Sequence, residues 1–444
     1  MGIIILIISA VIEIALAIYC IATKSNQKRI RSWVRIGVFA TFVIFTLASV
    51  IQWGFRWYLL AVILLIWAMI GGVSLLFKKK DKKEYKALRI VLRAIVMCLI
   101  AVIVIIPALI FPQYKLPGMT GDYKVNTSVY TYTDNSRIET FNNKDEAREV
   151  NITFWYPVDA DNKFPLAVFS HGAFGIRDSN TSTFSELASN GYIVCSIDHP
   201  YHSLYTIDTD GNFTMVDKSF MQEVFDVNNG VYRDETAFKL EKKWLKLRTD
   251  DMNFVLDMII KNSIDKGSDK VYQLIDTDKI GLIGHSLGGA ASVQLGRERK
   301  DVNAVINLDA DLLGEVEGIA NGKPVINQEI YPVPLLSIYS DTMKKLMANV
   351  MDQDIVIPQK LISATAPNAY EAYITGTNHM SFTDLPLFSP FLVNMINGSI
   401  KNSGSGQEVE ADKNDVINTM NSIVLEFFDC YLKGKGSFNS AGTY

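Results

Sequence analysis

Four long apolar stretches occupy the first quarter of the chain. They cover residues 3–22, 34–51, 57–77 and 94–111. Each is close to the ~20 residues that an α-helix needs to cross the hydrocarbon core of a bilayer. We therefore expect an all-α membrane domain of four transmembrane helices over residues 1–112. Glu13 lies inside the first stretch, and we interpret it as a structural carboxyl group within a small helical bundle.

After residue 112 the pattern changes, because short apolar runs alternate with segments of helical spacing. Strand-like runs occupy 150–156, 166–170, 192–197, 279–283, 304–308, 335–339 and 370–375, and helix-like segments occupy 183–190, 244–260 and 416–432. This alternation predicts an α/β domain with a mostly parallel sheet covered on both faces. We place a linker at 113–124 and the α/β domain at 125–444. Residues 203–243 lack a clean period, and we interpret them as a lid insertion.

Charge divides along the same boundary. Residues 1–112 carry 14 Lys and Arg against 3 Asp and Glu, whereas residues 113–444 carry 29 against 44. The acidic second part disfavours nucleic acid as a partner, since phosphates need a basic surface. Basic residues concentrate between the first and second stretches and between the third and fourth, and such loops remain cytoplasmic. We therefore predict a multi-pass protein of the cell membrane whose second part is extracytoplasmic.

Residues 284–289 read Gly-His-Ser-Leu-Gly-Gly and follow the strand-like run 279–283 directly. A strand, a sharp turn with small residues around a serine, and a helix form the nucleophile elbow. Ser286 is therefore the candidate nucleophile. The backbone N–H of Leu287 is one candidate oxyanion donor, and that of Ala173, in the loop after 166–170, is the other.

A serine hydroxyl needs a base to accept its proton. Hydrolases with this elbow place the acid and then the histidine after the serine along the chain. His379 is therefore the candidate base, with His199 in reserve. Asp309 and Asp341 each follow a predicted strand, and strand geometry leaves both open as the acid that orients the imidazole. No CxxC pair occurs among the four cysteines, and we expect no metal and no organic cofactor.

With these motifs the sequence resembles the platelet-activating factor acetylhydrolases (the plasma and type II intracellular branch) and their bacterial relatives in the α/β-hydrolase superfamily. The matching stretches are 133–137, 150–157, 170–172, 197–199, 284–289, 307–310 and 376–382 with Asp384. The resemblance implies an α/β-hydrolase fold and favours Asp309 over Asp341 as the acid. It also implies hydrolysis of short acyl groups from phospholipid-like esters through an acyl-enzyme.

Together these inferences predict a membrane-anchored serine esterase whose partners are an ester or phospholipid substrate and the bilayer. Two alternatives remain. One is a carboxylesterase or lipase of broad substrate range. The other is a membrane sensor or transporter that carries a catalytically inactive hydrolase fold.

Overall fold

The computed structural model describes residues 2–76, 85–158, 161–232, 234–265, 267–351, 355–399 and 410–444. It separates into two compact units. The first comprises residues 1–114 with 388–392, and the second comprises 115–387 with 393–444. Each unit has its own buried apolar core.

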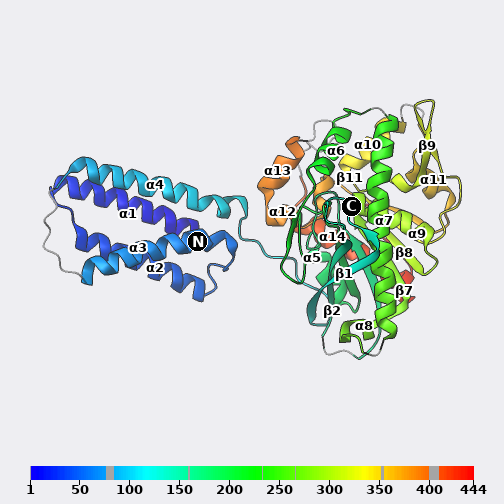
Figure 1. Cartoon of the computed structure of the whole chain (residues 1–444), viewed down its shortest axis with the longest axis horizontal. Helices are drawn as coiled ribbons and strands as arrows, with labels where there is room; N and C mark the ends of the chain where they lie inside the picture. Colours follow the sequence, from blue (N-terminus) through cyan, green and yellow to red (C-terminus); the bar gives the residue numbers. More distant parts are fainter. Residues whose placement is uncertain are drawn as a thin grey trace. The chain divides into compact units, whose positions relative to one another are not determined.

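The first unit is a bundle of four helices (Figure 1). They are α1 (Gly2–Ala22), α2 (Lys28–Leu47), α3 (Tyr58–Leu76, preceded by the short turn η1, Phe55–Trp57) and α4 (Ala87–Ile110). All four are long and apolar enough to cross a membrane, as expected. Helices α2 and α4 begin earlier than the apolar stretches predicted. Their first turns carry arginines, which form helix readily, and an apolar pattern does not detect such turns.

Glu13 faces two arginines inside this bundle. Its carboxylate lies 3.7 Å from Arg31 Nε and 3.4 Å from Arg35 Nε. Glu13 of α1 thus forms ion pairs with Arg31 and Arg35 of α2. These contacts agree with the interpretation of Glu13 as a structural carboxyl group. Most of the basic residues between the third and fourth stretches, at 77–84, lie outside the described residues.

The second unit is built on a nine-stranded sheet in the order β1-β2-β4-β3-β7-β8-β11-β12-β13. Its strands are β1 (Val125–Ile138), β2 (Ala147–Pro157), β4 (Ile193–Asp198), β3 (Phe164–Ser170), β7 (Ile275–His285), β8 (Val302–Leu308), β11 (Leu335–Ser340), β12 (Ala369–Ile374) and β13 (Gly442–Thr443). Only β1–β2 and β2–β4 pair antiparallel within it. The prediction of a mostly parallel sheet is confirmed. The half-exposed, largely polar edge strand β1 was not predicted, because it has no apolar run.

Helices cover both faces of this sheet (Figure 1). Because successive side chains of a strand point to opposite faces, β3 contributes Leu166 and Val168 to one core and Ala167 and Phe169 to the other. Helices α7 (Asp234–Ile264) and α9 (Leu287–Glu298) complete the first core, and α5 (Thr181–Ser189) and α14 (Lys413–Lys433) complete the second. This packing explains why the central strands are continuous apolar runs.

Smaller elements connect the sheet and helices. They are α8 (Lys270–Gln273), η2 (Leu313–Glu315), the hairpin β9 (Val316–Ala320) and β10 (Lys323–Ile326), α10 (Asp341–Met351), α11 (Pro358–Thr365), η3 (His379–Phe382), α12 (Leu385–Phe388) and α13 (Pro390–Ser399). The segment 203–243 holds the hairpin β5 (Tyr205–Ile207) and β6 (Phe213–Met215), the helix α6 (Lys218–Asn228) and the first turns of α7.

Candidate active site

Ser286 lies at a sharp turn between β7 and α9, as predicted from its sequence context. Its backbone has φ 54° and ψ −128°, a left-handed conformation that a non-glycine residue rarely adopts. The surrounding structure enforces it, because the Ser286 N–H donates to Leu308 O at 2.9 Å. A Cβ at Gly288 would lie 2.0 Å from the carbonyl oxygen of Ser170. Only glycine at position 288 allows α9 to approach β3 this closely.

His379 and Asp309 are in direct contact. Nδ1 of His379 lies 2.8 Å from Oδ2 of Asp309. Asp309 is buried and is held by Ser340, whose N–H donates at 2.7 Å and whose hydroxyl donates at 2.9 Å. The His379 side chain is 31% exposed. A buried carboxylate with its remaining lone pairs occupied can orient an imidazole and stabilise its protonated form.

The elbow and the His379 loop lie side by side. Nε2 of His285 contacts the backbone carbonyl of His379 at 2.9 Å, and the two rings lie 4.6 Å apart. The Ser286 N–H donates a hydrogen bond to the backbone carbonyl of Leu308, the residue that precedes Asp309. The structure therefore gathers Ser286, Asp309 and His379, which come from three distant parts of the chain, around one end of the sheet.

Asp341 has a different place. Its Oδ2 accepts a hydrogen bond from Gly376 N at 2.7 Å, so it holds the turn after β12. Asp309, in contrast, meets the imidazole itself. Asp309 follows β8 in a left-handed conformation, with φ 53°, and this bend turns its side chain toward the His379 loop.

The two candidate oxyanion donors lie near the nucleophile. Leu287 is the first residue of α9, so its N–H has no acceptor within the helix. Ala173 follows Gly172, where a Cβ would lie 3.0 Å from Cβ of Ser286. Among the residues that the structure describes, no protein acceptor bonds the Ala173 N–H. Both groups can therefore donate to a substrate oxygen.

The other four histidines are buried and have structural partners. His171 Nε2 meets the Ser203 hydroxyl at 2.8 Å. His199 lies between Ser170 Oγ at 2.9 Å and Asp251 Oδ2 at 3.0 Å. Burial lowers the pKa of His199, and likewise that of His285, to about 3. Both rings are therefore neutral at pH 7, and the reserve base His199 is enclosed in the interior.

A buried polar network beneath the loop 171–173 was not anticipated from the sequence. Helix α7 supplies Arg248 and Asp251, both completely buried. Asp251 accepts two hydrogen bonds of 2.7 Å from Arg148 and one of 2.9 Å from Arg137. A signal was present, because Arg248 and Asp251 fall on the same apolar helical stripe as Trp244 and Val255. Charged residues on such a stripe indicate a buried polar site.

In the described parts of the chain, no group of three or more His, Cys, Asp or Glu side chains is arranged to hold a metal ion. The four cysteines are all free.

Comparison with known proteins gives concordant matches. A family model described as platelet-activating factor acetylhydrolase, isoform II, matches residues 123–442. The platelet-activating factor acetylhydrolase of Canis lupus familiaris is 33% identical over 195 residues, or 40% of this chain and 43% of that protein. The one from Gallus gallus is 24% identical over 299 residues, or 62% of this chain and 64% of that protein. The chain thus matches roughly half of the length of these curated relatives.

A solved ferulic acid esterase from Streptomyces cinnamoneus resembles this chain in fold. It aligns with a TM-score of 0.55 and 21% identity, and covers 72% of this chain and 94% of its own. At this level of identity the likeness concerns the fold alone.

Proposed function

Because this chain belongs to the platelet-activating factor acetylhydrolase, isoform II, family, we propose that it is a membrane-anchored serine esterase. The second unit hydrolyses acyl esters, and the four apolar helices of the first unit hold it at the membrane. The contact between His379 and Asp309 beside the strained elbow of Ser286 carries this proposal.

In the proposed reaction Ser286 Oγ bonds the ester carbonyl carbon while Nε2 of His379 takes the hydroxyl proton. The carbonyl oxygen becomes an oxyanion that accepts hydrogen bonds from the N–H groups of Leu287 and Ala173. The bond to the alcohol then breaks, and His379 returns the proton to the leaving oxygen. Water attacks the acyl-enzyme in the same way, and the carboxylic acid and free Ser286 are released.

Ser286→Ala tests the nucleophile. We expect the purified full-length protein to hydrolyse p-nitrophenyl acetate and to react with a fluorophosphonate probe. The variant should lose both activities and keep its melting temperature. Labelling that persists in the variant would assign another nucleophile. A wild-type protein that neither reacts nor hydrolyses would favour an inactive hydrolase fold.

The apolar cluster beside the proposed oxyanion donors favours a short acyl group. The buried members of this cluster are Val216, Phe220, Val224, Trp244 and Leu287, and the side chains packed against them include Ala173 and Phe174. Aromatic side chains already occupy the space next to both donors, so a long acyl chain would have to displace them.

A series of p-nitrophenyl esters of increasing acyl length tests this preference, followed by phospholipids with an acetyl or a long acyl group. We expect kcat/KM to fall as the acyl chain lengthens. A preference for long chains would instead identify a lipase or a broad carboxylesterase.

We also propose that the N-terminus and everything after α4 lie outside the cytoplasm. The basic residues at both α1–α2 and α3–α4 connections support this orientation. Alkaline phosphatase fused after residue 444 should be active in a bacterial host, whereas a fusion within the α3–α4 connection should be inactive. The reverse pattern would refute the orientation.

A further inference from the structure

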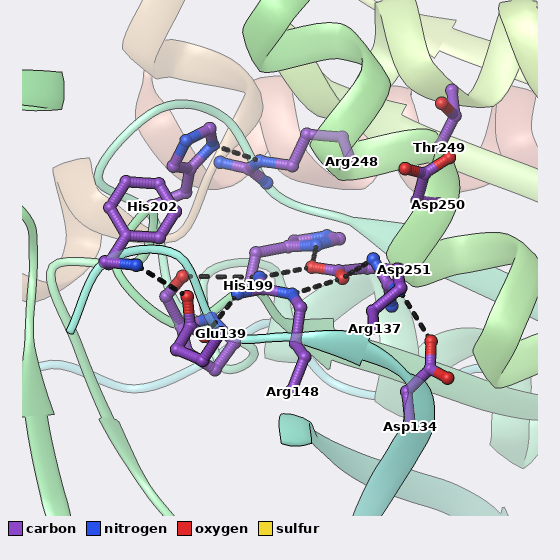
Figure 2. A network of polar contacts seen from close by, with 12 residues as sticks. Asp134, Arg137, Glu139, Arg148, His199, His202, Arg248, Thr249, Asp250 and Asp251 are labelled. Atoms are coloured by element: carbon purple, nitrogen blue, oxygen red, sulfur yellow. Dashed lines mark hydrogen bonds and ion pairs between the residues drawn. The ribbon is translucent and has the colours of Figure 1, made fainter. Parts of the chain in front are cut away.

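Arg248 is a completely buried guanidinium whose acceptors include two successive backbone carbonyls. Its Nη1 donates to His171 O at 2.8 Å, and its Nη2 donates to Gly172 O at 3.2 Å. Within the described ranges no carboxylate lies at ion-pair distance from it. Figure 2 shows Arg248 and Asp251 entering the polar network from the same helix. A buried cation is costly unless its surroundings use its hydrogen bonds.

The Gly172 carbonyl belongs to the peptide unit that carries the Ala173 N–H. No cis peptide bond occurs among the described residues, and in a planar trans peptide the C=O and N–H point in opposite directions. Nδ1 of His171 contacts the same carbonyl oxygen at 2.7 Å. Holding this oxygen toward the interior therefore aims the Ala173 N–H away from Arg248, on the more exposed side of the loop.

We propose that Arg248 is a positioning residue that holds the Ala173 N–H in place as the second oxyanion donor. This inference rests on the proposed function. It assigns to a residue that touches no substrate the task of keeping one donor preorganised, and preorganisation is the main source of oxyanion stabilisation. A hydrogen bond to the carbonyl also polarises the peptide unit and strengthens its N–H as a donor.

The charge state of Arg248 suits this role. Burial lowers the pKa of Arg248 to about 9, so the side chain is still cationic at pH 7. Its Nε donates to Nδ1 of His202 at 3.3 Å, and burial together with Arg248 keeps the pKa of His202 well below its usual value. His202 is therefore neutral, and its Nδ1 is free to accept.

The proposed lid reaches the same loop from the other side. The His202 ring stacks on Phe220 of α6, with centroids 3.7 Å apart and planes 4° apart. Phe174, which follows Ala173, also packs against Phe220 and Phe225. It adopts φ 62°, which this packing has to maintain. The donor loop is thus held between Arg248 and α6.

Arg148 provides a matched control within the same network (Figure 2). It is buried like Arg248, but it donates to Asp251 and Glu139 at 2.7 Å. Its backbone contact is Pro200 O at 3.4 Å, outside the loop 171–173. Changing Arg148 should therefore disturb the network and its stability without releasing the donor.

The test compares R248K, R248M and R148K in the purified full-length protein. R248M should lower kcat for p-nitrophenyl acetate by about 100-fold, near the effect of losing one oxyanion donor. KM should change by less than about threefold. R248K keeps a hydrogen-bond donor in the core and is the variant expected to fold. Since an ammonium group replaces the fork that spans two carbonyls, its kcat should fall by about 10-fold.

A second readout separates positioning from general damage. Acyl trifluoromethyl ketones add to the serine and place an oxyanion in the hole, whereas the matching alcohols do not. In R248K the affinity for the ketone should fall in proportion to kcat/KM, while the affinity for the alcohol stays unchanged. R148K should lower the melting temperature and keep kcat within about threefold.

An R248K protein with unchanged kcat would overturn the proposal, as would equal losses of ketone and alcohol affinity. If S286A abolishes activity while R248K keeps it, only the role of Arg248 fails. If S286A keeps activity, the proposed function itself fails.

Discussion

Asp309 and Asp341 illustrate how two residues with similar sequence context acquire different tasks. Both follow apolar strands of the parallel sheet, at the same edge. Asp309 contacts His379, whereas Asp341 accepts the Gly376 N–H at the end of β12. The difference depends on backbone φ at Asp309 and on Ser340, which holds the Asp309 carboxylate from the neighbouring strand.

The two aspartates therefore predict different responses to the same substitution. Asp309→Asn should lower kcat for p-nitrophenyl acetate by about 10⁴-fold, because an amide cannot stabilise the imidazolium or hold its tautomer. Asp341→Asn should keep kcat within about threefold, since the amide oxygen can still accept the Gly376 N–H. Steady-state kinetics on both purified variants decide the matter. Comparable losses would show that the contact with His379 does not define the acid.

At the scale of elements, the approach of α9 to the sheet shapes the site. Its first turn lies against β3 so closely that a Cβ at Gly288 would meet the Ser170 carbonyl at 2.0 Å. This contact between backbones brings the α9 N-terminus, with Leu287, next to the loop after β3. The elbow glycines thus serve helix–strand packing as well as the turn itself.

Gly288→Ala should destabilise the second unit by about 3 kcal/mol, because neither backbone can move away without disrupting its strand or helix. Thermal unfolding of the detergent-purified protein measures the loss. Gly318→Ala in β9 is the control. Among the described residues, no atom beyond its own chain neighbours lies within 4 Å of the added carbon there, so the change should stay within about 0.5 kcal/mol. Equal melting temperatures for the two variants would contradict the packing argument.

At the scale of the whole molecule, buried histidines set the response to acid. Burial lowers the pKa of all four histidines other than His379, to about 3 for His199 and His285 and well below the usual value for His171 and His202. The unfolded chain takes up these protons near pH 6.5, and the folded chain does not. The free energy of unfolding therefore falls as pH decreases from about 6.5 toward 3.

Several carboxyl groups act in the opposite direction. Burial raises the pKa of Asp198 and Glu241 to about 7 and that of Asp384 to about 6, and it also raises the pKa of Asp178 and Asp311. The folded state protonates these groups before the unfolded state does, so they add stability as pH falls through 7 toward 4. The imidazoles act together with the carboxylate of Asp251: burial favours its neutral form, but Arg148 holds its pKa well below the usual value. We expect a net loss of stability in acid.

Melting temperatures of the full-length protein between pH 7 and pH 4.5 test this balance. The wild-type melting temperature should decrease toward acid. Asp384→Asn should make the decrease steeper, because it removes one opposing group while its amide oxygen can still accept the Ser182 N–H that Asp384 now binds at 2.8 Å. Parallel curves for the two proteins would show that Asp384 does not titrate in this range.

Features that depend on residues close together along the chain could be predicted from the sequence. Long apolar stretches predicted four helices, short apolar runs predicted the central strands, and six residues around Ser286 predicted the elbow. The sequence did not predict that α2 begins at Lys28 and α4 at Ala87, and it did not predict the edge strand β1. The polar residues of these segments carry no apolar signal.

Contacts between residues far apart along the chain became visible only in the folded structure. Strand geometry left Asp309 and Asp341 open, and only the family resemblance at 307–310 favoured Asp309, because the contact with His379 joins residues 70 positions apart. No local pattern places Arg248 beneath the carbonyls of His171 and Gly172, 77 and 76 positions away. Which charged groups are buried and which of them pair depends on how helices, strands and loops that are far apart along the chain pack against one another. Periodicity along the chain reports which face a residue occupies, and it does not report the partner across that face.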